Sequence, residues 1–140
     1  MPSDMDMMES LKADGLRITK PRRAILALLE KAPSPLTAGQ VHARLAQSRQ
    51  SVDLVTVYRT LMILKRLGLV AQVELGDGQF YYEIRHGRAH HHHIRCRGCG
   101  AIVDLMLCPL KRLTGLIERQ TRFLVESHAL EFIGLCARCR

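Results

Sequence analysis

The sequence has no run of about 18 consecutive apolar residues, the length that a membrane-spanning helix requires. It also has no apolar secretory segment near Met1, no internal repeat, and no low-complexity tract apart from four consecutive histidines. These absences predict a cytoplasmic protein that does not contact a membrane. In a reducing compartment, its five cysteines are more often metal ligands than disulfide partners.

The chain of 140 residues is 47% hydrophobic, which is enough for one domain or for two small ones. Its formal net charge of +8 is unevenly distributed along the sequence. Residues 17–66 contain ten lysines and arginines against two acidic residues, whereas residues 67–84 contain three acidic residues and no base. A concentrated positive charge of this kind is typical of a surface that binds nucleic-acid phosphates.

The hydrophobic pattern predicts an α+β fold that begins with a winged helix-turn-helix. Helices are expected over residues 4–14, from a Thr19 cap with Pro21 to about residue 30, from a Thr37 cap over residues 38–45, and over residues 54–67. In the last of these, Leu54, Val57, Leu61 and Leu64 are expected to face inward. Residues 70–84 alternate like a hairpin with a two-residue Asp77-Gly78 turn.

The expected boundaries are residues 1–84 for a winged-helix DNA-binding domain, 85–89 for a hinge, and 90–140 for a small α/β domain. The second domain is expected to contain strands over residues 91–96, 101–106 and 128–135, with a helix that begins at Pro109. A domain of this size makes only a modest core and often needs a metal to stabilise it.

The helix that follows the polar stretch 47–51 is the expected DNA-reading helix, because the second helix of a helix-turn-helix enters the major groove. Thr56 and Arg59 lie off its apolar face and are free to contact DNA, whereas Tyr58 either packs or reaches a phosphate with its hydroxyl. Four basic residues near a helix start are expected to hold phosphates: Arg17, Lys20, Arg22 and Arg23. The alternative interpretation is a solvated helix surface.

The cysteines form two Cys-x-x-Cys pairs, Cys96 with Cys99 and Cys136 with Cys139. Four thiolates satisfy tetrahedral zinc and leave no open position, so this set predicts a structural Zn²⁺ site. A redox dithiol is the alternative, but it fits poorly because there are two pairs and no thioredoxin-like context. Cys108 is expected to be a small core or capping residue rather than a ligand.

The four histidines are expected to serve two different sites, because successive side chains of a strand point to opposite faces. His90 and His92 would then share one face and His91 and His93 the other. Two further residues are expected on the first face, namely Asp104 on the next strand and His128 at the start of the last strand. Near the second pair in sequence lie Glu83 and His86. The alternative is a solvated loop or an expression tag.

These motifs together resemble the ferric uptake regulator family of metal-dependent bacterial transcription regulators. The residues that carry the resemblance are Gly15-Leu16-Arg17-Ile18-Thr19 with Pro21-Arg22, Thr56-Val57-Tyr58-Arg59-Thr60-Leu61, His90–His93 with Cys96-x2-Cys99-Gly100, and Cys136-x2-Cys139. The resemblance covers nearly the whole chain.

The resemblance implies a homodimer joined through the C-terminal domains, with winged-helix domains that bind a palindromic operator in double-stranded DNA. It implies regulatory Fe²⁺, Zn²⁺ or Mn²⁺ at two sets of ligands: Glu83, His91 and His93, with His86 as a further candidate, at the hinge, and His90, His92, Asp104 and His128 at a second site. Ser34-Pro35-Leu36 contains no ligand where many members supply a histidine, and a peroxide sensor of the family also has Asp at position 104.

We therefore expect a metal-dependent transcriptional repressor that controls metal-uptake genes in response to iron. A zinc-, manganese- or peroxide-responsive regulator of the same family is the closest alternative. A His/Cys metallohydrolase is a more remote alternative, since it would need an open metal position with a general base.

Overall fold

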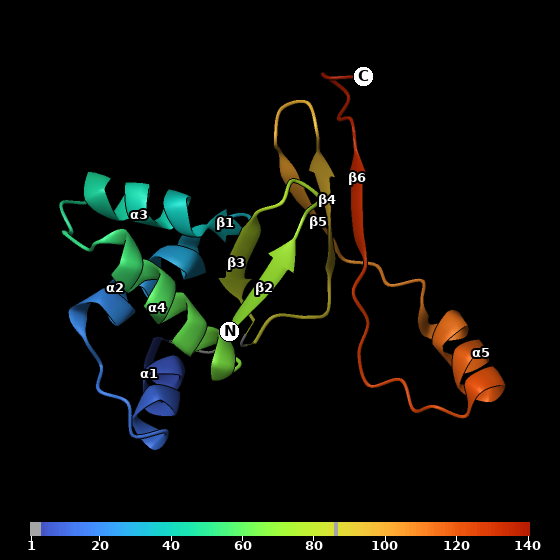
Figure 1. The fold of residues 1–140 in the computed structure, drawn as a ribbon, viewed down its shortest axis with the longest axis horizontal. Helices are drawn as coiled ribbons and strands as arrows, with labels where there is room; N and C mark the ends of the chain where they lie inside the picture. The colour runs from blue at the N-terminus through green and yellow to red at the C-terminus, as the bar shows by residue number, and fades with distance from the viewer. Residues whose placement is uncertain (1–3, 86) are drawn as a thin grey trace. The chain divides into compact units, whose positions relative to one another are not determined.

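The computed structural model describes residues 4–85 and 87–140, which form two compact units that divide between Arg88 and Ala89 (Figure 1). The N-terminal unit contains four helices and three strands among its described residues. In chain order they are α1 (Asp4–Ala13), α2 (Lys20–Lys31), β1 (Leu36–Thr37), α3 (Ala38–Gln47), α4 (Leu54–Arg66), β2 (Val70–Glu74) and β3 (Phe80–Ile84). This order of helices and strands is the predicted winged helix-turn-helix, so the expected fold class is confirmed.

The three central helices begin at side chains that cap their first backbone N–H groups. The Thr19 hydroxyl accepts from the backbone N–H of Arg22 at the start of α2. Thr37 and Gln40 form a reciprocal capping box at α3, and the Asp53 carboxylate caps α4. Local sequence therefore determines where each of these three helices begins.

The core of the N-terminal unit lies where α2, α3 and α4 meet. Leu26, Val41, Val57 and Leu61 are completely buried there. The expectation that Leu54 faces inward was wrong, since its side chain is 39% exposed. It is the first residue of α4 and lies beyond the turns that pack on the core.

A three-stranded sheet in the order β1-β3-β2 completes this unit. The hairpin pairs Val70 with Ile84 and Glu74 with Phe80, so residues 75–79 form the connection. The predicted two-residue turn was therefore too short, and Asp77 instead accepts a hydrogen bond from the Tyr81 hydroxyl at 2.6 Å. Strand β1 escaped prediction because two residues cannot display a strand alternation.

The C-terminal unit contains β4 (His92–Cys96), β5 (Ile102–Leu105), α5 (Lys111–Thr121) and β6 (Glu131–Gly134). Its sheet has the order β5-β4-β6, with β5 antiparallel and β6 parallel to the central strand β4. Extended segments join α5 to β5 and to β6 (Figure 1). Strand β4 is thus the element around which this unit is built.

The C-terminal unit has almost no hydrophobic core of its own. Among its described residues only His92, His93 and Cys96 are buried. Apolar side chains such as Val103, Leu116 and Phe123 are exposed, and α5 buries none of its residues. A unit of this kind needs ligands or a partner to be stable. In the part of the chain that the structure describes, no helix has both the length and the apolar character to span a bilayer.

Replacing Leu61 by Ala should lower the free energy of unfolding by about 2–5 kcal/mol, because it removes a completely buried side chain from the centre of the helical core. Urea denaturation followed by far-ultraviolet circular dichroism measures the change. The control is Met62→Ala on the same helix, where the side chain is 49% exposed and the change should stay within about 0.5 kcal/mol. Equal losses in the two variants would contradict the assigned core.

Candidate metal centres and basic face

The four paired cysteines lie together at one end of the C-terminal sheet. Cys96 is the last residue of β4, and the second pair follows β6. Their sulfur atoms all lie within 4.8 Å of one another, and the Sγ atoms of Cys99 and Cys136 are 3.8 Å apart. Because Zn–S bonds of about 2.3 Å in a tetrahedron place sulfurs about 3.8 Å apart, this cysteine cluster fits a zinc ion closely.

Backbone geometry presets the cysteine cluster. The parallel pairing of β4 with β6 places Cys96 beside Gly134, and the backbone N–H of Cys136 then donates to the Cys96 sulfur at 3.3 Å. This hydrogen bond is the largest of the effects that lower the pKa of Cys96 to about 6. Gly98 allows the close approach, since a Cβ atom there would lie 2.9 Å from Cβ of Cys139.

The sulfurs of the cysteine cluster compete for negative charge. The neighbouring Cys136 sulfur is the main cause that raises the pKa of Cys139 to about 12. All five cysteines of the chain are free thiols. One thiol of the cluster thus deprotonates more easily than usual and another less easily. A bound cation would favour the thiolate form of all four, because its positive charge balances theirs.

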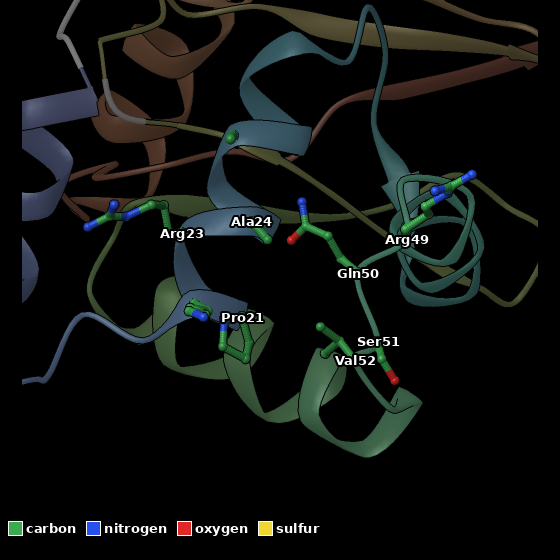
Figure 2. Close-up of a pocket in the computed structure, with 9 residues that line it drawn as sticks. Pro21, Arg23, Ala24, Arg49, Gln50, Ser51 and Val52 are labelled. Carbon is green, nitrogen blue, oxygen red and sulfur yellow. The ribbon is translucent and has the colours of Figure 1, made fainter.

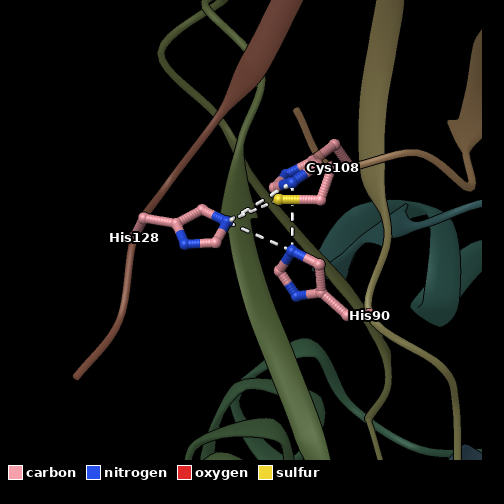
Figure 3. A group of neighbouring side chains, drawn as sticks. His90, Cys108 and His128 are labelled. Carbon is pink, nitrogen blue, oxygen red and sulfur yellow. Dashed lines mark hydrogen bonds between the residues drawn. The ribbon is translucent and has the colours of Figure 1, made fainter. Parts of the chain in front are cut away.

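A second cluster contains three of the predicted histidines. His90, His92 and His128 turn their Nε2 atoms toward one another, and Figure 3 shows His90, His128 and Cys108 converging from separate segments. The Nε2 atom of His128 lies 3.1 Å from that of His90 and 3.4 Å from that of His92. The Cys108 sulfur lies 3.5 Å from Nε2 of His128. We call these four residues the three-histidine cluster.

Asp104 does not belong to the three-histidine cluster, which corrects the expectation from sequence. Strands β4 and β5 pair His93 directly with Asp104, and directly opposed residues of an antiparallel pair point to the same face. Asp104 therefore shares a face with His93 rather than with His92. The sequence placed Asp104 on a strand but could not supply its register against β4.

The third cluster gathers on the opposite face of β4. The ligand atoms of His91, His93 and Asp104 lie within 4.8 Å of one another. Nε2 of His93 is 3.6 Å from an Asp104 oxygen, and the His93 side chain is only 2% exposed. The predicted separation of His90 and His92 from His91 and His93 is therefore seen in the structure. We call His91, His93 and Asp104 the His91/His93 cluster.

Strand β6 and the residue before it hold the ring orientation of both buried histidines. Nδ1 of His92 lies 3.1 Å from the carbonyl oxygen of Leu130, and Nδ1 of His93 lies 3.3 Å from a carboxylate oxygen of Glu131. A proton on each Nδ1 satisfies these acceptors and places the lone pair of each imidazole on Nε2, the nitrogen that would bind a metal. Burial lowers the pKa of His92, which also favours the neutral imidazole that binds metals.

Sequence reasoning did not identify Glu131. It is paired with His93 through the parallel register of β4 and β6, across a separation of 38 residues. Only the alternation of the last strand could have indicated it, and alternation does not reveal the neighbouring strand. Cys108 was missed as a neighbour of the histidines for a similar reason, since it belongs to no regular element.

The remaining candidate ligands belong to the other unit or lie outside the described residues. Glu83 ends up in the N-terminal unit, where its buried carboxylate accepts from the Arg88 guanidinium at 2.9 Å. Its role as a ligand with His91 and His93 stays a prediction. His86 lies outside the described residues.

Helix α4 presents part of the predicted DNA-reading surface to solvent. Arg59 is exposed and the Tyr58 side chain is 48% exposed, while Val57 and Leu61 hold the opposite face in the core. Thr56 is less available than expected, because its hydroxyl donates to the capping carboxylate of Asp53 at 2.8 Å. The backbone and hydroxyl hydrogen bonds of Thr56 lower the pKa of Asp53, so the cap stays ionised.

The other basic residues line the start of α2. Arg17, Lys20 and Arg23 are exposed, whereas Arg22 is half-buried and donates to the backbone carbonyl of Arg17. Arg22 thus stabilises the turn before α2 rather than projecting freely.

A groove of about 730 Å³ runs between α2 and the segment that precedes α4 (Figure 2). Pro21 faces Val52 across it, and Arg23 and Arg49 lie at its two sides. Arg49 adopts a left-handed backbone conformation with φ 57° in the turn after α3. The sequence predicts only a polar turn for this stretch. The structure adds Arg49 to the exposed basic residues near α2, namely Arg17, Lys20 and Arg23.

Comparison with known proteins gives a consistent picture. Residues 13–133 match the model of the Ferric uptake regulator family. The chain is 35% identical to the ferric uptake regulation protein of Bacillus subtilis over 134 residues, covering 94% of this chain and 90% of the other. It is 31% identical to the peroxide-responsive repressor PerR of Staphylococcus saprophyticus, covering 96% and 90%. The solved structure of the Helicobacter pylori ferric uptake regulator superposes with a TM-score of 0.85 at 22% identity, covering 99% of this chain and 94% of that one, and supports the fold.

Replacing Cys136 by Ser should abolish zinc retention at the cysteine cluster and unfold the end of the C-terminal sheet. The backbone hydrogen bond from Arg97 to Gly134, 2.9 Å long, should then lose its protection from hydrogen exchange. Zinc content and amide exchange measured by mass spectrometry check this. Leu107→Ser is the control, because that exposed side chain lies outside the metal-ligand clusters and its loss should leave both the zinc content and the Arg97 amide protection unchanged. Full protection in Cys136→Ser would contradict a structural metal at this place.

Proposed function

The chain belongs to the ferric uptake regulator family, and from that premise we propose that it represses metal-uptake genes in response to iron. Members of this family are metal-responsive, DNA-binding transcriptional repressors, and the chain is one of them rather than an enzyme. It binds zinc as a structural metal and Fe²⁺, Zn²⁺ or Mn²⁺ as a regulatory one. The iron proposal rests on the identity to a ferric uptake regulation protein, and the mixed nitrogen and oxygen donor set of the His91/His93 cluster suits Fe²⁺ among other metals.

The cysteine cluster is proposed as the structural zinc site. Four sulfurs within 4.8 Å of one another are enough to fill a tetrahedral zinc shell, which would leave no position for a substrate or for exchange with a second ligand. Zinc there would join the end of β4 to the segment after β6. This linkage is valuable in a unit whose apolar side chains are mostly exposed.

The His91/His93 cluster is proposed as the regulatory site. Its donors are two imidazoles and the Asp104 carboxylate, and mixed donors of this kind suit Fe²⁺, Mn²⁺ and Zn²⁺. Glu131 orients His93 from behind by accepting from Nδ1. We propose that Glu83 is a further ligand, as the family resemblance implies, so that metal binding can affect the DNA-binding domain through the hinge.

The chain acts as a dimeric DNA-binding regulator. We propose that the dimer forms through the C-terminal unit, where exposed apolar side chains such as Val103, Leu116 and Phe123 offer a surface that a second copy could cover. A two-fold dimer presents two copies of α4, and its operator is therefore proposed to be palindromic. Because DNA and reduced thiols occur in the cytoplasm, we propose that the protein works there.

Arg59 is proposed to read a base edge, and the basic residues near α2 to hold phosphates. An exposed arginine on the DNA-reading helix can donate two hydrogen bonds to guanine. Lys20, Arg23 and Arg49 surround the groove beside α2 and offer charge without base discrimination. Peroxide sensing is the second candidate, since a peroxide-responsive repressor is 31% identical over nearly the whole chain.

Operator binding should require metal and should weaken steeply as salt rises, because phosphate contacts release counterions. A gel-shift titration with an AT-rich palindrome, performed anaerobically without metal and then with Fe²⁺, Mn²⁺ or Zn²⁺, measures this. Fe²⁺ should be effective at a lower concentration than Mn²⁺, as the general order of metal affinities predicts. The double variant His91→Ala/His93→Ala should keep its structural zinc and its fold but lose the response to metal. Absence of binding with every metal would overturn the regulator proposal.

Replacing Arg59 by Ala should weaken operator binding by about 1–3 kcal/mol, that is roughly fivefold to 150-fold, and relax sequence preference at one base pair. Fluorescence anisotropy with the operator and with single-base variants measures both effects. Arg66→Ala is the matched control, because it removes the same charge from the last turn of the same helix. If the two variants lose affinity equally and without a change in preference, Arg59 contributes charge alone.

A further inference from the structure

We propose that Cys108 is the fourth ligand of the three-histidine cluster, so that this second site binds zinc through three nitrogens and one thiolate. The proposal rests on the proposed function only in taking the cluster to be a metal site. It replaces the carboxylate expected from sequence with a soft sulfur donor, and this changes the class of metal that the site selects.

The distances within the three-histidine cluster match a tetrahedral zinc centre. Zn–N bonds of about 2.0–2.1 Å and a Zn–S bond of about 2.3 Å require ligand separations of about 3.4 Å between nitrogens and about 3.6 Å from nitrogen to sulfur. The nitrogen of His90 lies 3.1 Å from that of His92 and 3.1 Å from that of His128. The remaining separations are 3.4 Å from His92 to His128 and 3.5 Å from His128 to the Cys108 sulfur.

Hydrogen bonding among these four residues does not explain their approach as well as a cation does. His92 has its Nδ1 atom beside the Leu130 carbonyl, so its Nε2 atom carries a lone pair. The Nε2 atoms of His90 and His128 lie within 3.1–3.4 Å of that lone pair and of each other. Three such nitrogens cannot all be both donor and acceptor to one another, whereas a metal accepts a lone pair from each of them.

The group of donors contains no carboxylate. Asp104 is opposite His93 and therefore lies on the other face of β4, within the His91/His93 cluster. Cys108 follows β5 after two residues without regular structure, and it brings its sulfur to His128, which lies twenty residues later in the sequence. The chain thus separates a nitrogen–sulfur donor set on one face from a nitrogen–oxygen donor set on the other.

The thiolate would make the two histidine sites select different metals. Thiolate and imidazole together favour Zn²⁺, and Co²⁺ as its substitute, over Mn²⁺, which prefers oxygen donors. Four protein donors also close the coordination shell, which suits a site without an exchangeable position. Discrimination among Fe²⁺, Mn²⁺ and Zn²⁺ then falls to the His91/His93 cluster, while the three-histidine cluster holds zinc.

A metal at the three-histidine cluster would also close the loop that carries α5. Cys108 precedes α5 and His128 follows it, so joining them restrains the whole segment between. That segment presents apolar side chains that α5 does not bury, including Leu113, Leu116 and Ile117. Zinc at this cluster would therefore reduce the conformational freedom of a surface that we propose forms part of the dimer interface.

Cobalt titration of the full-length protein tests Cys108 directly, because Co²⁺ bound by a thiolate absorbs strongly in the near ultraviolet. The protein is kept reduced, with its structural zinc retained and assayed throughout. Wild type should develop the charge-transfer band, and Cys108→Ser should lose it while the three histidines still bind cobalt weakly. In competition with a chelator, the zinc affinity of the three-histidine cluster should fall at least about tenfold in Cys108→Ser. Loss of a residue that only hydrogen-bonds to a metal ligand already lowers metal affinity by about this factor.

Two further variants make the cobalt result specific. Cys108→Asp replaces the sulfur donor with an oxygen donor. It should lose the thiolate–cobalt charge-transfer band and reduce the preference of the site for Zn²⁺ over Mn²⁺. Leu107→Ser changes the neighbouring exposed residue and should leave band and affinity unchanged. An unchanged band in Cys108→Ser, or no band in wild type, would overturn the proposal. If the proposal about Cys108 fails but operator binding still depends on metal, the proposed function stands. If the band depends on Cys108 but metal does not promote operator binding, the proposed regulatory function is wrong and the ligand assignment stands.

Discussion

The pairing of β4 with strands on both sides determines where the candidate metal ligands of the C-terminal unit lie. On one edge the antiparallel register sets His93 opposite Asp104, and on the other the parallel register sets it beside Glu131. Since neighbouring residues of β4 point to opposite faces, His92 then meets a different set of neighbours. A shift of one residue between β4 and β5 would move Asp104 to the face of His92, and the same shift between β4 and β6 would take Glu131 away from His93.

The same arrangement explains why this unit can exist with so little hydrophobic burial. Its buried side chains are two histidines and a cysteine, all three of them in metal-ligand clusters. A sheet of three short strands buries too little apolar surface to offset the entropy of ordering the chain. Under the proposed function, metal–ligand bonds and a partner subunit supply what the core does not, so folding, metal binding and dimerisation of this unit are expected to be thermodynamically linked.

The N-terminal unit solves the opposite problem, because it must keep a charged surface exposed on a stable scaffold. Helices α2, α3 and α4 bury one apolar face each and are capped by side chains at their own starts. Arg59 can therefore remain exposed while Val57 and Leu61, on the same helix, are completely buried. The basic residues owe their availability to this division of α4 into two faces.

Sequence alone determined the features that depend on near neighbours in the chain. Capping residues, helical periodicity, the two Cys-x-x-Cys pairs and the alternation of the histidine run all act within a few residues, and the structure agrees with them. Tertiary structure decided which distant residues join each histidine pair. Cys108 rather than Asp104 lies beside His128, because strand register depends on packing and hydrogen bonding across the whole sheet and leaves no trace in local sequence.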